Sequence, residues 1–185
     1  DTGNAIITIK GIGGYGGIYT TGFSINQAQS VLSFSNETIT RTYGDADFFC
    51  TLSKKVTDGA VYYSSSNTEV ASVDGASGKI TIKGTGTATI TAATSGGKNY
   101  GKAAASCIVC VKKAVNTIKA NDITKVYSTK AQTIAIGAQV AEGAEIRYLS
   151  SNKKIKVSKN GKVTIPKKFI GTVTITISAG ETKNY

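Results

Sequence analysis

The feature that most constrains this chain is a sequence unit that recurs along it with a period of about 85 residues, within the range typical of tandem domain arrays. Tyr15, Tyr100 and Tyr185 are evenly spaced at this period, and each follows a run of small residues, threonine and isoleucine. The two best-matched copies of that run are residues 86–92 and 171–177. A missed repeat misassigns the whole fold, so this period sets the domain organisation before any other pattern is considered.

Two further anchors fix where the units begin and end. Residues 63–67 match residues 148–152 at an offset of 85, and residues 39–43 match residues 123–127 at an offset of 84. The repeats divide the chain into the C-terminal strands of a preceding unit, a complete unit, and a unit without the segment that follows Tyr100, with the boundaries 1–27, 28–113 and 114–185. The chain is thus predicted to be a fragment of a longer tandem array.

Within each unit, apolar and polar residues alternate in short runs that are separated by Gly, Asn, Asp and Ser, and no run has the helical period. The runs follow one another about every 8 to 12 residues, which is typical of an antiparallel β-sandwich. Hydrophobic residues make up 40% of the chain and charged residues 18%, which excludes a disordered chain. We therefore expect an all-β protein built of tandem immunoglobulin-like sandwiches.

The alternation also predicts which side chains form the core. Ala88, Ile90 and Ala92 occupy the inward positions of the most regular strand. By alignment with Phe23 and Ile25, Ile108 and Cys110 are expected to face inward on the last strand and Cys107 to face outward. The other expected inward residues of the complete unit are Leu32, Phe34, Ile39, Phe48, Cys50, Leu52, Val61, Tyr63, Val70 and Val73.

The three cysteines are predicted to be structural. Cys50 stands where the other copy has Ile134, which makes it a core filler. Cys107 and Cys110 are three apart in a predicted strand, so they point to opposite faces and cannot share one metal ion. An antibody-type bridge would join the strand of Cys50 to that of Ile90, which carries no cysteine. A bond between Cys50 and Cys110 stays open as an alternative.

Several of the repeated motifs are those of a known family. They are Thr42-Tyr43-Gly44-Asp45, residues 63–67, Val70-Ala71-Ser72-Val73-Asp74, Gly78-Lys79-Ile80, residues 86–92 and Asn99-Tyr100. Together they resemble the bacterial immunoglobulin-like (group 2) domain, over nearly the whole chain. The third unit departs from the pattern, with Tyr127-Ser128-Thr129 where Tyr43-Gly44-Asp45 stands. The resemblance implies a bacterial cell-surface or secreted protein whose tandem units form stalks, adhesins or accessory modules, with no catalytic residues.

The composition excludes several classes of chemistry. The chain has no histidine, so neither histidine catalysis nor a histidine-metal site can exist. Asp45 and Asp47 share a loop that lacks the further acidic ligands of a calcium site. The glycine-rich run 11–17 has neither the following helix nor the Lys-Ser/Thr of a phosphate loop, and predicts a hairpin turn. We expect no enzyme, metal or cofactor, and the sequence shows neither a signal peptide nor an apolar run long enough to span a membrane.

A basic cluster is the strongest candidate for a binding site. The net charge is +11, and the range 114–185, with 12 basic and 4 acidic side chains, contributes +8 of it. The first interpretation is that these lysines protect strand edges and aid solubility, and the alternative is a patch that binds a polyanion such as teichoic acid, an acidic glycan or nucleic acid. Few aromatic residues lie among them, which argues against nucleic acid. The cluster consists of Lys153, Lys154, Lys156, Lys159, Lys162, Lys167 and Lys168.

The leading hypothesis is a non-catalytic spacer whose partners are the neighbouring repeats of its own longer chain. The alternative is an adhesin or a glycan-binding module for cell-wall or host glycans. Tyr19, Phe49 and Tyr62 are the aromatic residues predicted to be exposed and able to stack on sugars. We expect a monomer, unless the N-terminal hairpin completes the open sheet edge of a neighbouring molecule.

Overall fold

The structure is a computed structural model that describes residues 1–141 and 143–185. Over these residues the chain forms strands and loops only, which confirms the all-β prediction. No helix in the described residues could therefore cross a membrane. The chain divides into two compact units, Asp1–Lys112 and Lys113–Tyr185.

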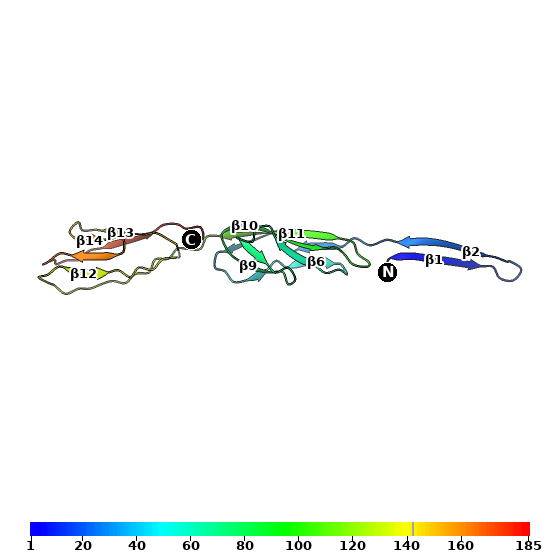
Figure 1. The fold of residues 1–185 in the computed structure, drawn as a ribbon, viewed down its shortest axis with the longest axis horizontal. Helices are drawn as coiled ribbons and strands as arrows, with labels where there is room; N and C mark the ends of the chain where they lie inside the picture. Colours follow the sequence, from blue (N-terminus) through cyan, green and yellow to red (C-terminus); the bar gives the residue numbers. More distant parts are fainter. Residues whose placement is uncertain (142) are drawn as a thin grey trace. The chain divides into compact units, whose positions relative to one another are not determined.

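The first unit contains a two-layered β-sandwich (Figure 1). One layer is the four-stranded sheet β4-β11-β10-β7, in which β4 runs parallel to β11 and the other neighbours are antiparallel. The other layer consists of the pair β3-β6 and the sheet β5-β9-β8. The strands are β3 (Val31–Phe34), β4 (Thr38–Thr42), β5 (Phe48–Phe49), β6 (Leu52–Val56), β7 (Tyr62–Ser65), β8 (Ala71–Val73), β9 (Lys79–Ile82), β10 (Gly86–Thr94) and β11 (Ala103–Lys112).

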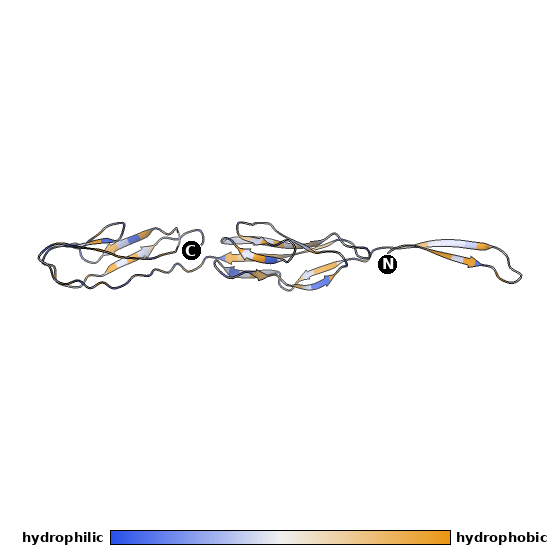
Figure 2. Ribbon diagram, turned by 60° about the horizontal axis from the view of Figure 1, so that its bottom comes forward, coloured by the Kyte–Doolittle hydropathy of each residue, from blue (hydrophilic) through white to orange (hydrophobic). Residues whose placement is uncertain are grey.

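The core of this sandwich follows the predicted alternation closely. The largest fully buried side chains are Ile80, Ile90, Val109 and Cys107. Ala88, Ile90 and Ala92 on β10 are all buried, as predicted, while intervening positions remain more accessible. Figure 2 shows apolar and polar residues mixed along these strands, as expected when one face of each strand packs inward.

The prediction for the last strand of this unit is wrong. On β11, Cys107, Val109 and Val111 are buried, whereas Ile108 is exposed and Cys110 is only partly buried. Cys107 lies directly opposite the buried Ile90, and residues opposite each other in a sheet share a face. The prediction assumed that inward and outward positions on this strand match those of residues 18–25 at a constant offset. A shift of one residue moves every side chain of a strand to the opposite face.

The N-terminal hairpin explains that shift. It pairs β1 (Gly3–Lys10) with β2 (Ile18–Ile25), and Gly3 lies opposite Ile25. Ala88, which stands one period after Gly3, instead lies opposite Val109, so the second strand is displaced by one residue between the two copies. The turn follows the prediction, with the N–H of Gly11 donating to the carbonyl oxygen of Gly17 at 3.0 Å.

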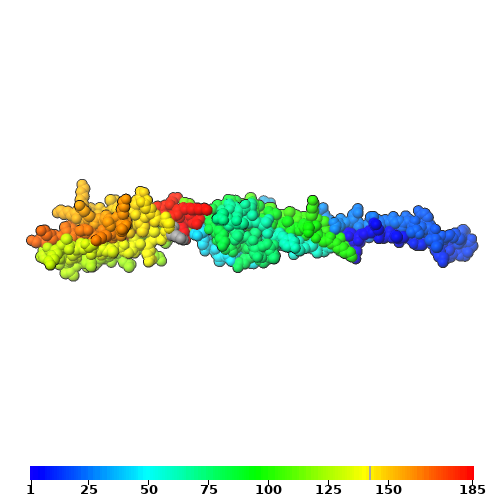
Figure 3. All heavy atoms as spheres, in the orientation of Figure 1, coloured from blue at the N-terminus to red at the C-terminus, as the bar shows by residue number. Residues whose placement is uncertain are grey.

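Both faces of this hairpin are exposed. Ile6, Ile9 and Phe23 are 72%, 57% and 49% accessible, and Figure 3 shows the hairpin's atoms (blue) uncovered on the face in view. Polar contacts at its base join it to the rest of the first unit. The N–H of Thr2 donates to Oδ1 of Asn99 at 3.1 Å, and Nε2 of Gln27 donates to the carbonyl oxygen of Gly97 at 2.8 Å.

The second compact unit, Lys113–Tyr185, corresponds to the third unit of the sequence repeat. It contains two small sheets, of order β12-β15-β14 and β13-β16. Its hydrophobic core is much thinner, because Ile155 and Val163 are the buried apolar side chains among its described residues. Its strands are β12 (Gln132–Ala135), β13 (Ile146–Ser150), β14 (Lys156–Val157), β15 (Lys162–Ile165) and β16 (Ile175–Ala179).

A tyrosine packed on a glycine occurs in both units at matching positions. Gly78 has φ +75, and a Cβ there would lie 3.0 Å from the ring of Tyr63. Gly161 has φ +70, and a Cβ there would lie 2.8 Å from the hydroxyl oxygen of Tyr148. Only glycine combines that backbone conformation with such a close ring. The same packing therefore recurs where the sequence repeats.

Replacing Gly78 by alanine is expected to destabilise the first unit by about 1–3 kcal/mol, from the left-handed backbone and the displaced tyrosine ring. The measurement is the free energy of unfolding in denaturant. Gly14→Ala is the control, because that glycine has no left-handed φ and a Cβ there would have no atom within 4 Å. Equal effects of the two substitutions would contradict the assignment.

The turn between β8 and β9 is closed by a carboxylate. Oδ1 of Asp74 accepts hydrogen bonds from the N–H and the hydroxyl of Ser77 at 2.7 and 2.6 Å, and from the N–H of Ala76 at 3.3 Å. These bonds, led by that of the Ser77 hydroxyl, lower the pKa of Asp74 from its ordinary value. The ionised form is thus favoured in the folded state.

A carboxyl whose pKa is lowered by folding stabilises the fold above its unfolded pKa, and the contribution disappears as the pH falls through the folded value. We therefore expect Asp74→Asn to be less stable than the parent at neutral pH, with the difference shrinking below about pH 4. Denaturant unfolding of both proteins from neutral pH down to about pH 2.5 measures this. A difference that is independent of pH would contradict it.

Candidate functional site

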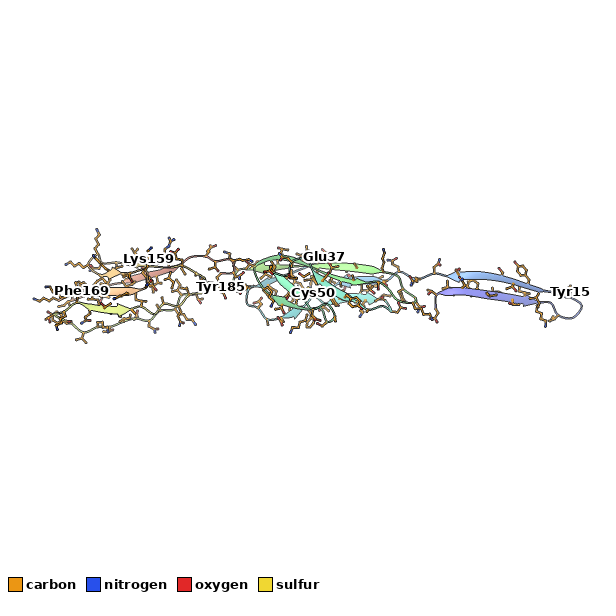
Figure 4. The ribbon with its side chains drawn as sticks, in the orientation of Figure 1. Tyr15, Glu37, Cys50, Lys159, Phe169 and Tyr185 are labelled. Atoms are coloured by element: carbon orange, nitrogen blue, oxygen red, sulfur yellow. The ribbon has the colours of Figure 1, made fainter. Side chains whose placement is uncertain are left out.

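The seven lysines of the predicted basic cluster are all exposed and lie around strands β14 and β15. Because these strands are antiparallel, the turn before β14 and the loop after β15 lie at one end of the pair. The β14–β15 turn, which carries Lys159 (Figure 4), lies at the other end. In chain order, Lys153 and Lys154 precede β14, Lys156 lies on β14, Lys159 follows it, Lys162 lies on β15, and Lys167 and Lys168 follow β15.

Two of these lysines share one face of a sheet. Lys156 lies opposite Thr164, and Lys162 is two residues before Thr164 on the same strand, so both side chains point to the outer face. Val163 lies between them in sequence on β15 and points inward, where it is buried. The alternation of lysine and valine thus presents the positive charges to solvent.

The charges of this lysine cluster are not neutralised by ion pairs within the described residues. Two carboxylates of the second unit pair with other cations, since Glu145 lies 3.3 Å from Arg147 and Glu181 lies 3.0 Å from Lys113. Exposed lysines on a unit of high net positive charge attract polyanions through a field that salt screens.

The acidic loop of the first unit is occupied by internal contacts. Oδ2 of Asp45 accepts a hydrogen bond from the N–H of Thr42 at 2.9 Å, whereas Asp47 forms an ion pair of 2.8 Å with Lys79. The hydrogen bond to Lys79 lowers the pKa of Asp47 and raises the pKa of Lys79. No group of three or more potential metal-ligating side chains occurs in the part of the chain that the structure describes.

The three aromatic residues are exposed but come from different places. Tyr19 lies on β2 of the hairpin, whereas Phe49 and Tyr62 lie on β5 and β7, which belong to opposite layers of the sandwich. Because the outer faces of opposite layers point away from each other, the fold does not gather these residues into one platform for stacking on sugars.

An open cleft in the second unit is a feature that the sequence analysis did not name. Its volume is about 720 Å³. It is lined in part by aliphatic side chains of β12, β15 and β16 and by Phe169, which Figure 4 labels in the loop after β15. The lining includes Ile134, Ile136, Val163, Ile165, Ile175 and Ile177.

The chain has a local similarity to a known family. Residues 54–97, less than half of the chain, match the family described as "Intimin, immunoglobulin-like domain". The matched segment runs from β6 to beyond the end of β10 and includes the core strand with Ile90. A comparison with curated proteins finds no match. Together with the two-layered topology, the family match defines the class as an all-β chain with an immunoglobulin-like sandwich.

Solved structures that match nearly the whole chain come from longer proteins. A structure of Drosophila N-cadherin EC1-4 is 16% identical with a TM-score of 0.33, and the match covers 97% of this chain and 55% of that one. A structure of the surface layer protein SbsC, domains 1-6, is 14% identical with a TM-score of 0.33, and the match covers 98% of this chain and 34% of that one. The chain thus spans about half the length of the first structure and about a third of the second.

Proposed function

We propose that this chain is a piece of a non-catalytic spacer, a series of immunoglobulin-like repeats in a bacterial cell-surface or secreted protein. The observation that carries the proposal is the recurrence of one sequence unit at a constant period. Matching side-chain packing is found at equivalent positions of two copies. Tyr63 on Gly78 and Tyr148 on Gly161 are the clearest example. The match of residues 54–97 to the immunoglobulin-like domain of intimin supports an extracellular, adhesin-related setting.

The state of residues 123–127 supports a repeat that lacks its last strand. In the first unit β11 fills the space beside β10 and also pairs with β4. Residues 123–127, the counterpart of β4, form no strand in the second unit. A strand needs a partner for its backbone hydrogen bonds. Without a counterpart of β11, residues 123–127 are therefore expected to form no strand. The flanking sequence of the longer protein is expected to continue the same period.

A polyanion-binding module is the second candidate, and the seven exposed lysines favour it. In contrast to the spacer, it requires saturable binding. Binding through counterion release weakens steeply with salt, so an interaction seen only at low ionic strength would reflect the net charge alone. The two functions therefore differ in what is seen at physiological salt.

A binding screen separates them. The full chain is tested against acidic glycans, teichoic acid and heparin at about 0.15 M salt. As a spacer, it is expected to show no saturable binding. Saturable binding that Lys154→Gln/Lys156→Gln weakens at least about tenfold would replace the spacer with a binding module. Lys54→Gln/Lys55→Gln on β6 is the matched control, with the same loss of charge at two exposed residues of the first unit.

A further inference from the structure

Two of the three cysteines meet in the centre of the first unit. Cys50 lies between β5 and β6, in one layer of the sandwich, and Cys107 lies on β11 in the other layer. They are 6% and 0% exposed and belong to the same hydrophobic cluster, and Cys107 is close enough to Cys50 to help raise the pKa of its thiol. Figure 4 shows Cys50 among the strands of this sandwich. Two cysteines far apart in sequence thus share the core between the two layers.

The third cysteine is excluded from this pair by the alternation of β11. Cys110 is three residues from Cys107, is only partly buried, and lies opposite Thr87 and Thr40 on the neighbouring strands. Thr87 is exposed, so this row of residues belongs to the outer face of the sheet. The alternative bond between Cys50 and Cys110 would therefore have to pass through the layer that separates them.

The folded core protects these thiols from chemistry. Burial among apolar side chains, followed by the neighbouring Cys107 thiol, raises the pKa of Cys50 to about 12 against a smaller opposing effect of Arg41. The reactive species in disulfide exchange is the thiolate, which is scarce under these conditions. Oxidation therefore belongs to the folding chain, before the two layers close, rather than to the finished sandwich.

We propose that Cys50 and Cys107 are joined by a disulfide between the two layers when the chain folds in the presence of a small-molecule disulfide such as oxidised glutathione. One cysteine thiolate attacks the oxidant and releases one glutathione, and the other cysteine then attacks the mixed disulfide and releases the second. The two cysteines lose two protons and two electrons as their S–S bond forms, and the oxidant's S–S bond is reduced to two thiols. This inference is independent of the spacer function.

The test is refolding of the full chain in a mixture of reduced and oxidised glutathione, followed by mass spectrometry. The mass is expected to fall by about 2 Da, and one thiol is expected to react with an alkylating agent in denaturant. Digestion without reductant should give a peptide in which Cys50 is linked to Cys107. The midpoint of thermal unfolding of the first unit should rise by on the order of 10 °C, because the bond closes a long loop, and return to its starting value with reductant.

Cys110→Ser is the matched control. It should lose the same mass, keep no reactive thiol and show the same rise in unfolding temperature. Cys50→Ala and Cys107→Ala should each show no fall in mass on refolding. The measurement on the parent chain stands by itself even if one of these variants fails to fold. Three reactive thiols after refolding of the parent, a mapped bond to Cys110, or an oxidised form less stable than the reduced one would each overturn the proposal.

Discussion

Replacing Ile90 by aspartate is expected to unfold the sandwich of the first unit. Ile90 has no exposed surface, lies at the centre of β10, and pairs with Cys107 on one side and Ser65 on the other. The substitution places a carboxylate among buried apolar side chains, at an expected cost of about 5 kcal/mol or more. Small domains have only about 5–15 kcal/mol of stability, so most molecules should lose this fold.

The measurement is the dispersion of methyl and amide resonances in NMR spectra at room temperature, with far-ultraviolet circular dichroism beside it. Thr87→Asp is the control, because Thr87 lies on the same strand three residues away and is exposed. It should change the stability by no more than about 0.5 kcal/mol. A well-folded Ile90→Asp protein would show that β10 is not the centre of the core.

Much of this sandwich could be predicted from local alternation. The positions of Ala88, Ile90 and Ala92 follow from a strand with one buried face, and the structure confirms them. Cys50 as a core residue follows from its equivalence to Ile134 and is also confirmed. These predictions succeed because burial on one face imposes a period of two on the residues of a single strand, whatever the partner strand does.

The pairing between strands could not be predicted in the same way. The phase of β11 depends on its register with β10, which a one-residue difference between the N-terminal hairpin and the complete unit changes. The burial of Cys107 in the same core as Cys50 depends on that register and on the packing of two layers, so the orientations of Cys107 and Cys110 were predicted the wrong way round. The absence of strand structure at residues 123–127 likewise depends on a partner strand rather than on the segment's own residues.

For the candidate binding surface too, features of a single strand could be predicted from the sequence, whereas features that depend on strand pairing could not. Exposure of Lys156 follows from its alternation with Ile155 and Val157, a pattern that is visible in the sequence alone. The arrangement of the other lysines at the two ends of the β14–β15 pair follows from the antiparallel pairing, which only the structure supplies. The scatter of Tyr19, Phe49 and Tyr62 over separate strands also required knowledge of the sheet order.

The corner that follows β10 is the other place where one substitution should have a large effect. Gly96 has φ +87, its N–H donates to Oγ1 of Thr94 at 3.1 Å, and a Cβ there would lie against the carbonyl oxygen of Tyr100 and the backbone of Gly101. The neighbouring N–H of Gly97 donates to that same Tyr100 oxygen at 2.9 Å. Neither backbone atom can move aside without breaking this turn.

Gly96→Val is therefore expected to destabilise the first unit by on the order of 3–5 kcal/mol, since a β-branched side chain adds left-handed strain to the overlap with backbone. Denaturant unfolding measures the loss, and Gly16→Val in the hairpin turn is the matched control, because that glycine has no left-handed φ and a Cβ there would have nothing within 4 Å. If the two variants were equally stable, the corner would be able to rearrange. The close packing of residues 94–101 would then contribute nothing to holding β10 and β11 in register.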